Sequence, residues 1–598
     1  MCKKTYYLGL FIFVMFINLA VVLFYFDKRD GMHIDEMFSY GHSNSSVGGF
    51  IYDGIDHFFR PESADVIKNK WISTDDFKKY LIVGEDNKFS YGNILENLRK
   101  DVHPPLYYFI LHSICSYFDG EFSKWFGGGI NIVCFLLIMG VLFKFFKLFI
   151  KDEKYFWVVL ALWGGSNIGI STFMYIRMYA LQCLLFVLLL YEMGKIIKYN
   201  KASKESLFLV FLYSSLGILN HYNSIIFSMI VGGVSGCVLL ARKNYSLLFK
   251  LAVSFVGSIL ILFLVVPYAK DVLLYSQRGS GAILRIKEVA LNLLDVFEGD
   301  FYRFIKIYIC DFWNMKFEVN FILASYFIIG CNWFYYKSFL FNKTLESLLI
   351  NCCYCVILFL GYFQPIGCLV LLFVLNLIMK HIFKDLKKNK LSDKISYDDL
   401  FGWGLVIAFL YVLIIFIIVP IMWEYDTRYI MGIMPLVAVL TIEVFIRLGK
   451  YLKVNEKFWY WFLILVVIFN CLQTDFGKRS VFRFQNDEET VRSLELIKDK
   501  DVFVISHYHA SLLFFGRIYY LMNARRVYVA TSSKSEKLMK EIYANRDALV
   551  LVLNKLHAEE FYGLPSQLDR NEELKNMLIK KGELNTTGKK YTLYEIKK

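Results

Sequence analysis

An acidic pair lies near the amino terminus, in the stretch HIDEMFSYGHS that spans residues 33–43. Asp35 and Glu36 follow the first long apolar run, 6–26, by about nine residues. At that distance from a membrane span, a carboxylate would lie where lipid headgroups meet water. Such a group could act as a general base that takes a proton from an acceptor hydroxyl. The alternative interpretation is a pair of solvated acids in a loop.

Two adjacent prolines follow a histidine in the stretch DVHPPLYYFILH, although the chain has only 8 prolines in 598 residues. Proline is tolerated in the first turn of a helix, where its missing N–H has no intrahelical partner to lose. Pro104 and Pro105 therefore predict a rigid helix start, with His103 just before it and Tyr107 just after. Taken alone, this pattern indicates only where a helix begins.

Three further polar positions interrupt apolar runs. Arg177 lies in MYIRMYAL beside Tyr179, and Arg428 lies with Tyr429 in WEYDTRYIMGIMPL. The planar guanidinium fork of arginine matches phosphate oxygens. His221 lies in LGILNHYNSIIF. Each residue has an alternative interpretation. Arg177 could mark the end of a helix, Arg428 could be an interfacial side chain, and His221 could belong to a polar connection between two helices.

Composition places these residues in a membrane protein. Hydrophobic residues make up 57% of the chain and charged residues 20%, with a mean hydropathy of +0.45. A soluble chain of this length would carry more charge. The formal charge is +14, but Lys and Arg cluster in short links between apolar runs. That placement is explained by membrane topology, so we expect no nucleic-acid partner.

The apolar runs predict about 12 to 14 transmembrane helices. The candidate spans are 6–26, 130–150, 155–174, 178–194, 205–220, 224–241, 247–267, 320–337, 346–360, 364–380, 400–421, 430–448 and 458–473, and 104–118 is a further, short candidate. The first run lacks a small-residue cleavage site, which favours an uncleaved span over a signal peptide.

The basic links orient the spans, because Lys and Arg favour cytoplasmic loops. This places the amino terminus in the cytoplasm and residues 475–598 outside. The loops 27–103 and 268–318, and all the candidate residues above, then fall on the outer face. Acid, base and cations converging there suit a lipid-phosphate donor whose head projects outward.

Three segments outside the spans carry structural signals. The first outer loop, 27–103, is acidic, with 14 Asp and Glu against 10 Lys and Arg. In the second outer loop, AILRIKEVALNLLDVF has helical apolar spacing, which predicts an amphipathic surface helix or an ordinary packed loop helix.

Residues 475–598 alternate strand and helix patterns: strands at 501–509, 525–531 and 547–555, and helices at 510–522 and 535–544. This predicts a small extracytoplasmic α/β domain attached to a transmembrane domain, 1–474.

The order of these motifs resembles the polytopic GT-C glycosyltransferases, in particular the bacterial branch related to protein O-mannosyltransferases (glycosyltransferase family 39) and to the lipid A aminoarabinose transferase. The matching motifs, in order, are the DE pair at 35–36, HPPLYY at 103–108, RMYAL at 177–181, LNHY at 219–222 and RY followed by a proline at 428–435. The match covers about residues 1–450. The 475–598 region resembles only the outward soluble domain that some members carry.

The resemblance implies a GT-C fold, a donor sugar on a polyprenyl phosphate, and an inverting transfer on the outer face of the bacterial cytoplasmic membrane. It implies Asp35 as the catalytic base, with Glu36 in support. His103 takes the place of a lysine that in some members meets the lipid phosphate, and Arg177 and Arg428 are further phosphate candidates. No cofactor is expected, although a divalent metal in oligosaccharyltransferase relatives keeps that question open. The acceptor, whether protein, lipid or glycan, is not specified.

Two other function classes fit the spans. A transporter or flippase of lipid-linked glycans would not need the acidic outer loop, and inverted repeats or broken helices would favour it. A glycan polymerase or ligase would share the outer-face site but would depend on Arg and His in a large late loop.

Overall fold

The computed structural model describes residues 3–46, 69–99, 101, 103–275, 397–418, 424–451, 453–472, 484–505, 519–530, 532–554, 568–586 and 589–597. The chain divides into two compact units. The helical unit contains Met1–Leu23, Asn131–Met174 and Met178–Val481. The mixed unit contains Phe24–Ile130, Tyr175–Arg177 and Phe482–Lys598.

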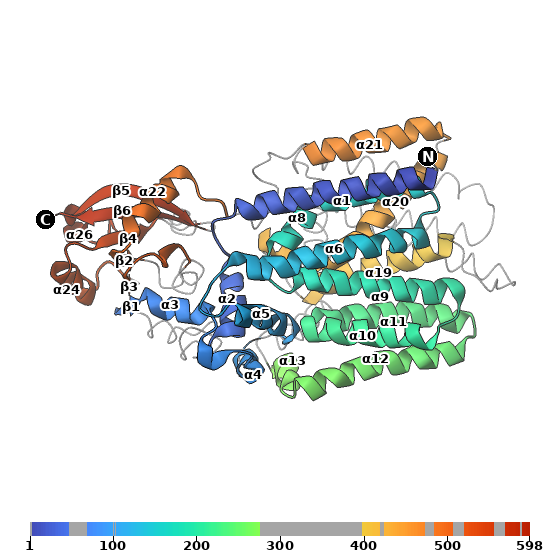
Figure 1. Cartoon of the computed structure of the whole chain (residues 1–598), viewed down its shortest axis with the longest axis horizontal. Helices are drawn as coiled ribbons and strands as arrows, with labels where there is room; N and C mark the ends of the chain where they lie inside the picture. Colours follow the sequence, from blue (N-terminus) through green and yellow to red (C-terminus); the bar gives the residue numbers. More distant parts are fainter. Residues whose placement is uncertain are drawn as a thin grey trace, which may run out of the picture. The chain divides into compact units, whose positions relative to one another are not determined.

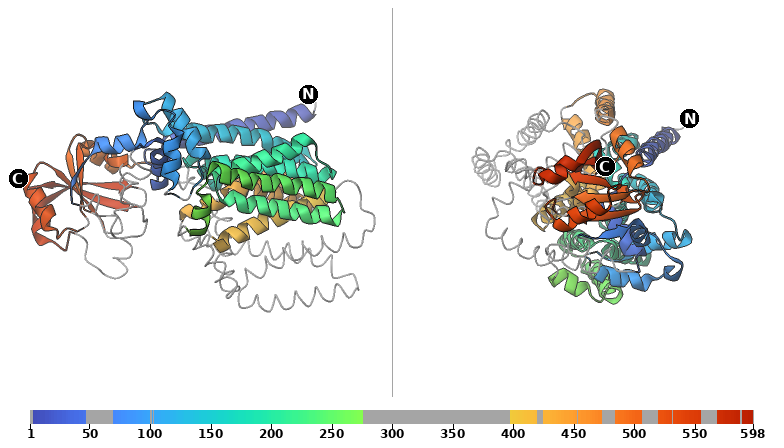
Figure 2. Two further views of the ribbon diagram at one scale, coloured as in Figure 1. Left: turned by 90° about the horizontal axis from the view of Figure 1, so that it is seen from below. Right: turned by 90° about the vertical axis from the view of Figure 1, so that its left-hand side faces the viewer.

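The helical unit is a bundle of long apolar helices (Figure 1). Its elements are α1 (Lys3–Asp27) and α6 (Lys124–Phe149), which both extend into the mixed unit, η3 (Glu153–Tyr155), α7 (Phe156–Gly164), α8 (Asn167–Met174), α9 (Tyr179–Tyr199), α10 (Lys204–Asn220), α11 (Asn223–Ala241), α12 (Tyr245–Val265), α13 (Ala269–Tyr275), α19 (Tyr397–Ile418), η5 (Glu424–Ile433), α20 (Met434–Tyr451) and α21 (Glu456–Leu472). Helices α9, α10, α11 and α12 lie side by side (Figure 2). Aromatic packing joins α9 to α11, where the Phe186 and Phe227 rings stack with centroids 3.6 Å apart.

Six helices in the described part of the chain are long and apolar enough to cross a membrane, and the number is seven if a bent pair counts as one span. This confirms the expected mostly helical, multi-span membrane protein with a C-terminal α/β sheet. The spans expected at 320–337, 346–360 and 364–380, and the amphipathic helix in 282–297, lie outside the described residues.

One expected span differs from the prediction. Residues 155–174 form two helices, α7 and α8, that are bent by 64° at a short break. A Cβ at Gly169 would lie 2.0 Å from the Trp163 carbonyl oxygen, so only glycine allows the chain to turn this sharply. The Ser166 hydroxyl caps the second helix by accepting the Gly169 N–H at 3.0 Å.

The mixed unit combines short helices from the first loop with a six-stranded sheet. Its elements are α2 (Ile34–Asn44), β1 (Trp71–Ser73), α3 (Thr74–Leu81), η2 (Glu85–Asn87), α4 (Tyr91–Arg99), α5 (Leu106–Tyr117), α22 (Glu488–Ile497), β2 (Asp501–Ile505), β3 (Arg526–Ala530), α24 (Glu536–Ala544), β4 (Leu549–Leu553), α26 (Glu572–Met577), β5 (Leu578–Thr586) and β6 (Lys589–Ile596). The strand order is β1-β3-β2-β4-β6-β5, with β3, β2 and β4 parallel and the outer strands antiparallel (Figure 1).

The three strands and the helix 536–544 agree with the expected α/β pattern, whereas most of the helix expected at 510–522 lies outside the described residues. Apolar residues of β2, β3 and β4 pack against α24 and α26 to form the core. The sequence patterns did not predict the β5–β6 hairpin. They also did not predict that β1, from the first loop, would add a strand to the C-terminal sheet, pairing Ile72 with Val527.

Candidate functional site

The short candidate span at 104–118 forms a helix that is too short to cross a bilayer. Helix α5 has 12 residues, about 18 Å at 1.5 Å per residue, whereas a bilayer core is about 30 Å thick. Pro105 immediately precedes the helix, and its carbonyl accepts the Phe109 N–H at 2.9 Å. The prolines therefore stand just before the first turn rather than within it. Tyr107 is fully buried, and burial raises its pKa well above the ordinary value.

The acidic pair opens helix α2, which begins after His33. The His33 ring nitrogen Nδ1 accepts the Asp35 N–H at 3.2 Å, and the His33 N–H donates to Glu36 Oε2 at 2.6 Å. This reciprocal capping fixes the first turn of the helix, so the two carboxylates point in defined directions. Adjacent positions on a helix face different ways, and the two acids consequently meet different surroundings.

Glu36 is a structural anchor in the interior of the mixed unit. Its carboxylate forms an ion pair with Arg29, and both side chains are fully buried. The same carboxylate accepts the Ile176 N–H at 2.7 Å. Burial raises the pKa of Glu36, while the Arg29 charge and the N–H donors oppose that shift. Glu36 thus ties residues 29 and 33 of its own stretch to residue 176, which is distant in sequence.

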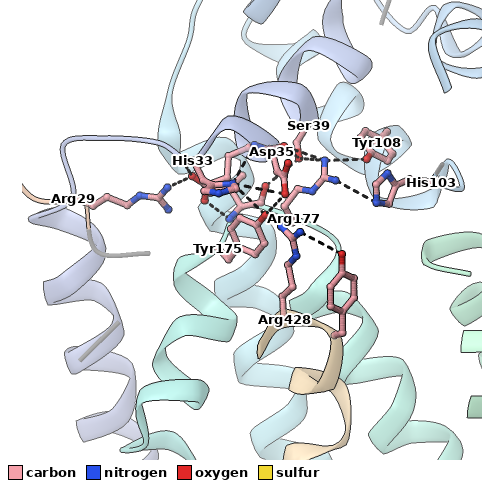
Figure 3. Close-up of polar contacts among 12 residues, drawn as sticks. Arg29, His33, Asp35, Ser39, His103, Tyr108, Tyr175, Arg177 and Arg428 are labelled. Carbon is pink, nitrogen blue, oxygen red and sulfur yellow. Dashed lines mark hydrogen bonds and ion pairs between the residues drawn. The ribbon is translucent and has the colours of Figure 1, made fainter. Parts of the chain in front are cut away.

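Asp35 is the accessible member of the pair. Its side chain is 22% exposed, and its Oδ2 accepts the Tyr175 hydroxyl at 2.7 Å. The His33 ring lies at 3.7 Å from the same oxygen (Figure 3). A carboxylate that is oriented by a hydroxyl and still open to its surroundings can accept a proton from a bound hydroxyl.

Arg177 lies beside this carboxylate, at the centre of the polar cluster in Figure 3. Its Nη1 donates to the Asp35 carbonyl oxygen at 3.0 Å, to the Tyr108 hydroxyl at 3.2 Å and to the Ser39 hydroxyl at 3.3 Å. The side chain is buried. The guanidinium is therefore fixed relative to Asp35 by α2 and α5 together.

His103 connects Arg177 to a second acid, Asp101. The His103 Nε2 is 3.3 Å from Arg177 Nη2, and its Nδ1 is 2.9 Å from Asp101 Oδ2. His42 Nε2 lies 3.3 Å from the same Asp101 oxygen. Burial lowers the pKa of His42 to about 4, so this histidine is neutral at pH 7. Burial would raise the pKa of Asp101, but His103, His42 and Arg177 outweigh it and hold that pKa far below its ordinary value.

The other four candidates lie in the helical unit. The Tyr179 ring is 5.5 Å from the His221 ring and 6.4 Å from the Tyr429 ring, measured between centroids. Arg428 Nη2 donates to the Tyr429 hydroxyl at 3.3 Å. The helical unit therefore brings together three aromatic or histidine rings and one arginine, contributed by α9, η5 and the α10–α11 turn.

Sequence reasoning thus identified Asp35, His103 and Arg177 as neighbours, but it missed other members of the cluster. Asp101 and His42 received no role, and neither did Arg29. The pattern Asp-x-His before the two prolines was the available signal for Asp101. Arg29 and His42 could not be found in this way, because their partners depend on how the first loop folds.

No group of three or more His, Cys, Asp or Glu side chains among the residues with described coordinates could hold a metal ion. The absence of a cofactor stays a prediction.

Comparisons with known proteins found similarity among solved structures only. No protein-family model matches the chain, and no curated protein matches it. Among solved structures, the chain is similar to ArnT from Cupriavidus metallidurans bound to undecaprenyl phosphate, with 10% sequence identity and a TM-score of 0.36. The similarity covers 98% of each chain. At this level of similarity, the roles of individual residues rest on the contacts within this chain.

Proposed function

We propose that the protein is a membrane glycosyltransferase that moves a sugar from a polyprenyl-phosphate donor to an acceptor hydroxyl on the outer face of a bacterial cytoplasmic membrane. The observation that carries this proposal is the juxtaposition of Asp35 and Arg177. Arg177 Nη1 donates to the Asp35 backbone carbonyl at 3.0 Å, so a fixed buried cation and the residue that carries an accessible carboxylate supply a charge stabiliser and a base in one site. The multi-span helical unit suits a lipid-borne donor.

In the proposed reaction, the acceptor oxygen attacks the anomeric carbon of the sugar from the face opposite the phosphate. Asp35 takes the acceptor proton as the new carbon–oxygen bond forms. The bond between the anomeric carbon and the phosphate oxygen breaks, and the configuration inverts. Positive charge at Arg177 stabilises the negative charge that grows on the departing phosphate. The products are the glycosylated acceptor, a polyprenyl phosphate and a proton on Asp35.

The remaining candidates take supporting roles. Glu36 supports catalysis indirectly, because its buried ion pair with Arg29 fixes the turn that carries Asp35. The helical unit contains Arg428, Tyr429, Tyr179 and His221, which stay candidates for binding the donor. The start of α5 is set by Pro104, Pro105 and Tyr107. The helix places the Tyr108 hydroxyl within hydrogen-bonding distance of Arg177.

Turnover of defined donors tests this proposal. The purified full-length chain is incubated with a panel of radiolabelled polyprenyl-phosphate sugars and with envelope material from a strain that lacks the gene. We expect label to move from at least one donor into that material. Mass spectrometry of surface glycans from the deletion strain should show the same sugar missing. Absence of transfer from every donor, together with unchanged surface glycans, would contradict the proposal.

One observation favours a second candidate, a flippase for lipid-linked glycans. The bent pair α7 and α8 has the geometry of a broken span or of a re-entrant loop, and broken spans are typical of secondary transporters. Proteoliposomes with a labelled polyprenyl-phosphate sugar and no acceptor distinguish the two functions. A flippase would move the lipid between leaflets, and Asp35→Asn would leave that movement intact. The glycosyltransferase proposal predicts movement no faster than in protein-free vesicles.

A further inference from the structure

The most informative feature outside the base itself is the chain of contacts that runs from Asp101 through His103 to Arg177. The His103 ring uses both nitrogens: Nδ1 faces the Asp101 carboxylate at 2.9 Å and Nε2 faces Arg177 at 3.3 Å. The three side chains are nearly enclosed, since Asp101 is 12% exposed and the other two less. Few water molecules can therefore substitute for these contacts.

Hydrogen-bond chemistry fixes the state of the His103 ring. Arginine has only donors, so a nitrogen at 3.3 Å from Arg177 Nη2 must present a lone pair. A carboxylate has only acceptors when ionised, so the nitrogen beside Asp101 must carry the proton. A neutral ring protonated on Nδ1 satisfies both partners. An imidazolium would instead direct an N–H at the guanidinium, and two cations would face each other in a poorly hydrated site.

His42 completes this arrangement on the far side of Asp101. Its Nε2 lies 3.3 Å from the same carboxylate oxygen that His103 contacts. Two neutral rings on one carboxylate oxygen do not cancel the negative charge on Asp101. That charge faces the positive charge on Arg177 through the intervening ring of His103. The set of four side chains is thus close to neutral, with the guanidinium as its only cation.

We infer that Asp101 and His103 are positioning residues that fix the Arg177 guanidinium, whose charge stabilises the donor phosphate, and that His103 accepts a hydrogen bond from Arg177 instead of binding the phosphate as a cation. This inference rests on the proposed function and revises the role that the family resemblance implies for His103. Because Arg177 also binds the Asp35 carbonyl, the same chain of contacts sets the distance between the phosphate-binding charge and the base.

Two substitutions at position 103 distinguish the roles. His103→Gln supplies one planar amide that can donate to Asp101 and accept from Arg177 without adding charge. His103→Lys supplies a cation that can only donate, which suits a direct phosphate contact but removes the acceptor for Arg177. The measured quantities are kcat and KM for the polyprenyl-phosphate sugar, together with the affinity of the purified chain for a polyprenyl phosphate alone.

We expect the H103Q variant to bind the polyprenyl phosphate at least tenfold more tightly than the H103K variant, with the difference appearing mainly in KM, by analogy with the hydrogen-bond partners of metal ligands, whose loss typically costs about 10- to 100-fold. Equal affinities, or tighter binding by the H103K variant, would overturn the inference. If the wild-type chain neither binds the polyprenyl phosphate nor transfers sugar, the proposed function itself fails, which is a different outcome.

Asp101→Asn provides a second test if the H103K variant does not fold. An amide at position 101 can direct its N–H groups at His103, which disturbs the required ring state. We expect donor KM to rise about tenfold or more relative to the matched control Asp75→Asn. Asp75 lies exposed in the first turn of α3, in the same unit, and its side chain is 72% exposed. An unchanged KM in the D101N variant would overturn the inference.

Discussion

Asp35 and Glu36 are consecutive residues with opposite environments. The Glu36 carboxylate is enclosed and ion-paired with Arg29, whereas the Asp35 carboxylate is partly exposed and accepts a hydrogen bond from Tyr175. The resemblance gave both residues a place in catalysis. Their surroundings assign them different roles. The fully buried and ion-paired Glu36 carboxylate cannot contact an acceptor, whereas the accessible Asp35 carboxylate can.

Glu36→Gln should destabilise the protein. The substitution keeps the size and shape of the side chain but leaves the Arg29 charge buried without its partner, which costs about 3–5 kcal/mol. We expect the midpoint of thermal unfolding in detergent to fall by several degrees. Glu96→Gln is the matched control, because Glu96 is 74% exposed on α4. Equal midpoints for the two variants would show that the ion pair does not hold the turn.

His42 should make stability depend on pH below neutrality. Its pKa is lowered from 6.5 to about 4 in the folded chain, so the unfolded chain binds a proton that the folded chain does not. The free energy of unfolding therefore falls as the pH drops from about 6.5 to about 4, by at most about 1.4 kcal/mol per pH unit. The matching loss for Asp101 lies lower, below its unfolded pKa of about 3.9.

The comparison that isolates this effect is His42→Gln, whose side chain does not titrate. Unfolding midpoints are measured from pH 7.5 to pH 4.5 for both proteins. We expect the midpoint of the wild type to fall more steeply than that of the H42Q variant. Parallel curves would mean that the pKa of His42 is the same in the folded and the unfolded chain.

Arg177→Lys should impair transfer even though it preserves the charge. An ammonium group is a point charge and cannot reproduce contacts from two guanidinium nitrogens to Asp35, Tyr108 and His103 together. We expect kcat/KM for the donor to fall by about 10²–10³-fold. Arg99→Lys, at an exposed position of α4, is the control and should keep wild-type turnover. Wild-type turnover by the R177K variant would remove Arg177 from the site.

Trp71→Ala should detach the first loop from the C-terminal sheet. The Trp71 ring packs against Phe503 and Tyr528, and its Nε1 donates to Glu541 at 2.9 Å. Loss of a large aromatic side chain from such packing costs about 3 kcal/mol. A lowered unfolding midpoint is expected, whereas Tyr117→Ala, at a residue that is 76% exposed, should leave it nearly unchanged. Equal effects of both variants would contradict a supporting role for β1.

The sequence predicted the parts of this molecule that depend on local patterns. Apolar length located most of the described spans, and alternation located β2, β3 and β4. Neither pattern could predict β1, because a strand of three residues is too short to show a periodicity and is defined only by its pairing with β3. The break at 164–167 was missed because glycine and serine within an apolar run do not reveal how closely the backbone turns.

The membership of the site was predictable in part from the sequence motifs, whereas the roles that depend on tertiary contacts were not. The order of the motifs grouped Asp35, His103 and Arg177, and the Arg177 side chain hydrogen-bonds to the Asp35 backbone carbonyl and to the His103 ring. The protonation state of His103 was not predictable, because it depends on Asp101 and Arg177 lying on opposite edges of one ring. The division of roles within the acidic pair likewise depends on Arg29, which reaches Glu36 only after the turn has folded.

The central claim is that Asp35 is the base of a sugar transfer. The most direct measurement compares the wild type, Asp35→Asn and Asp75→Asn for transfer of radiolabelled sugar from a polyprenyl-phosphate donor, with unfolding midpoints recorded for all three. We predict that the D35N variant keeps its midpoint and loses transfer by about 10²–10⁴-fold, while the D75N variant retains transfer. Transfer by a folded D35N variant at the wild-type rate would contradict the assignment of the base.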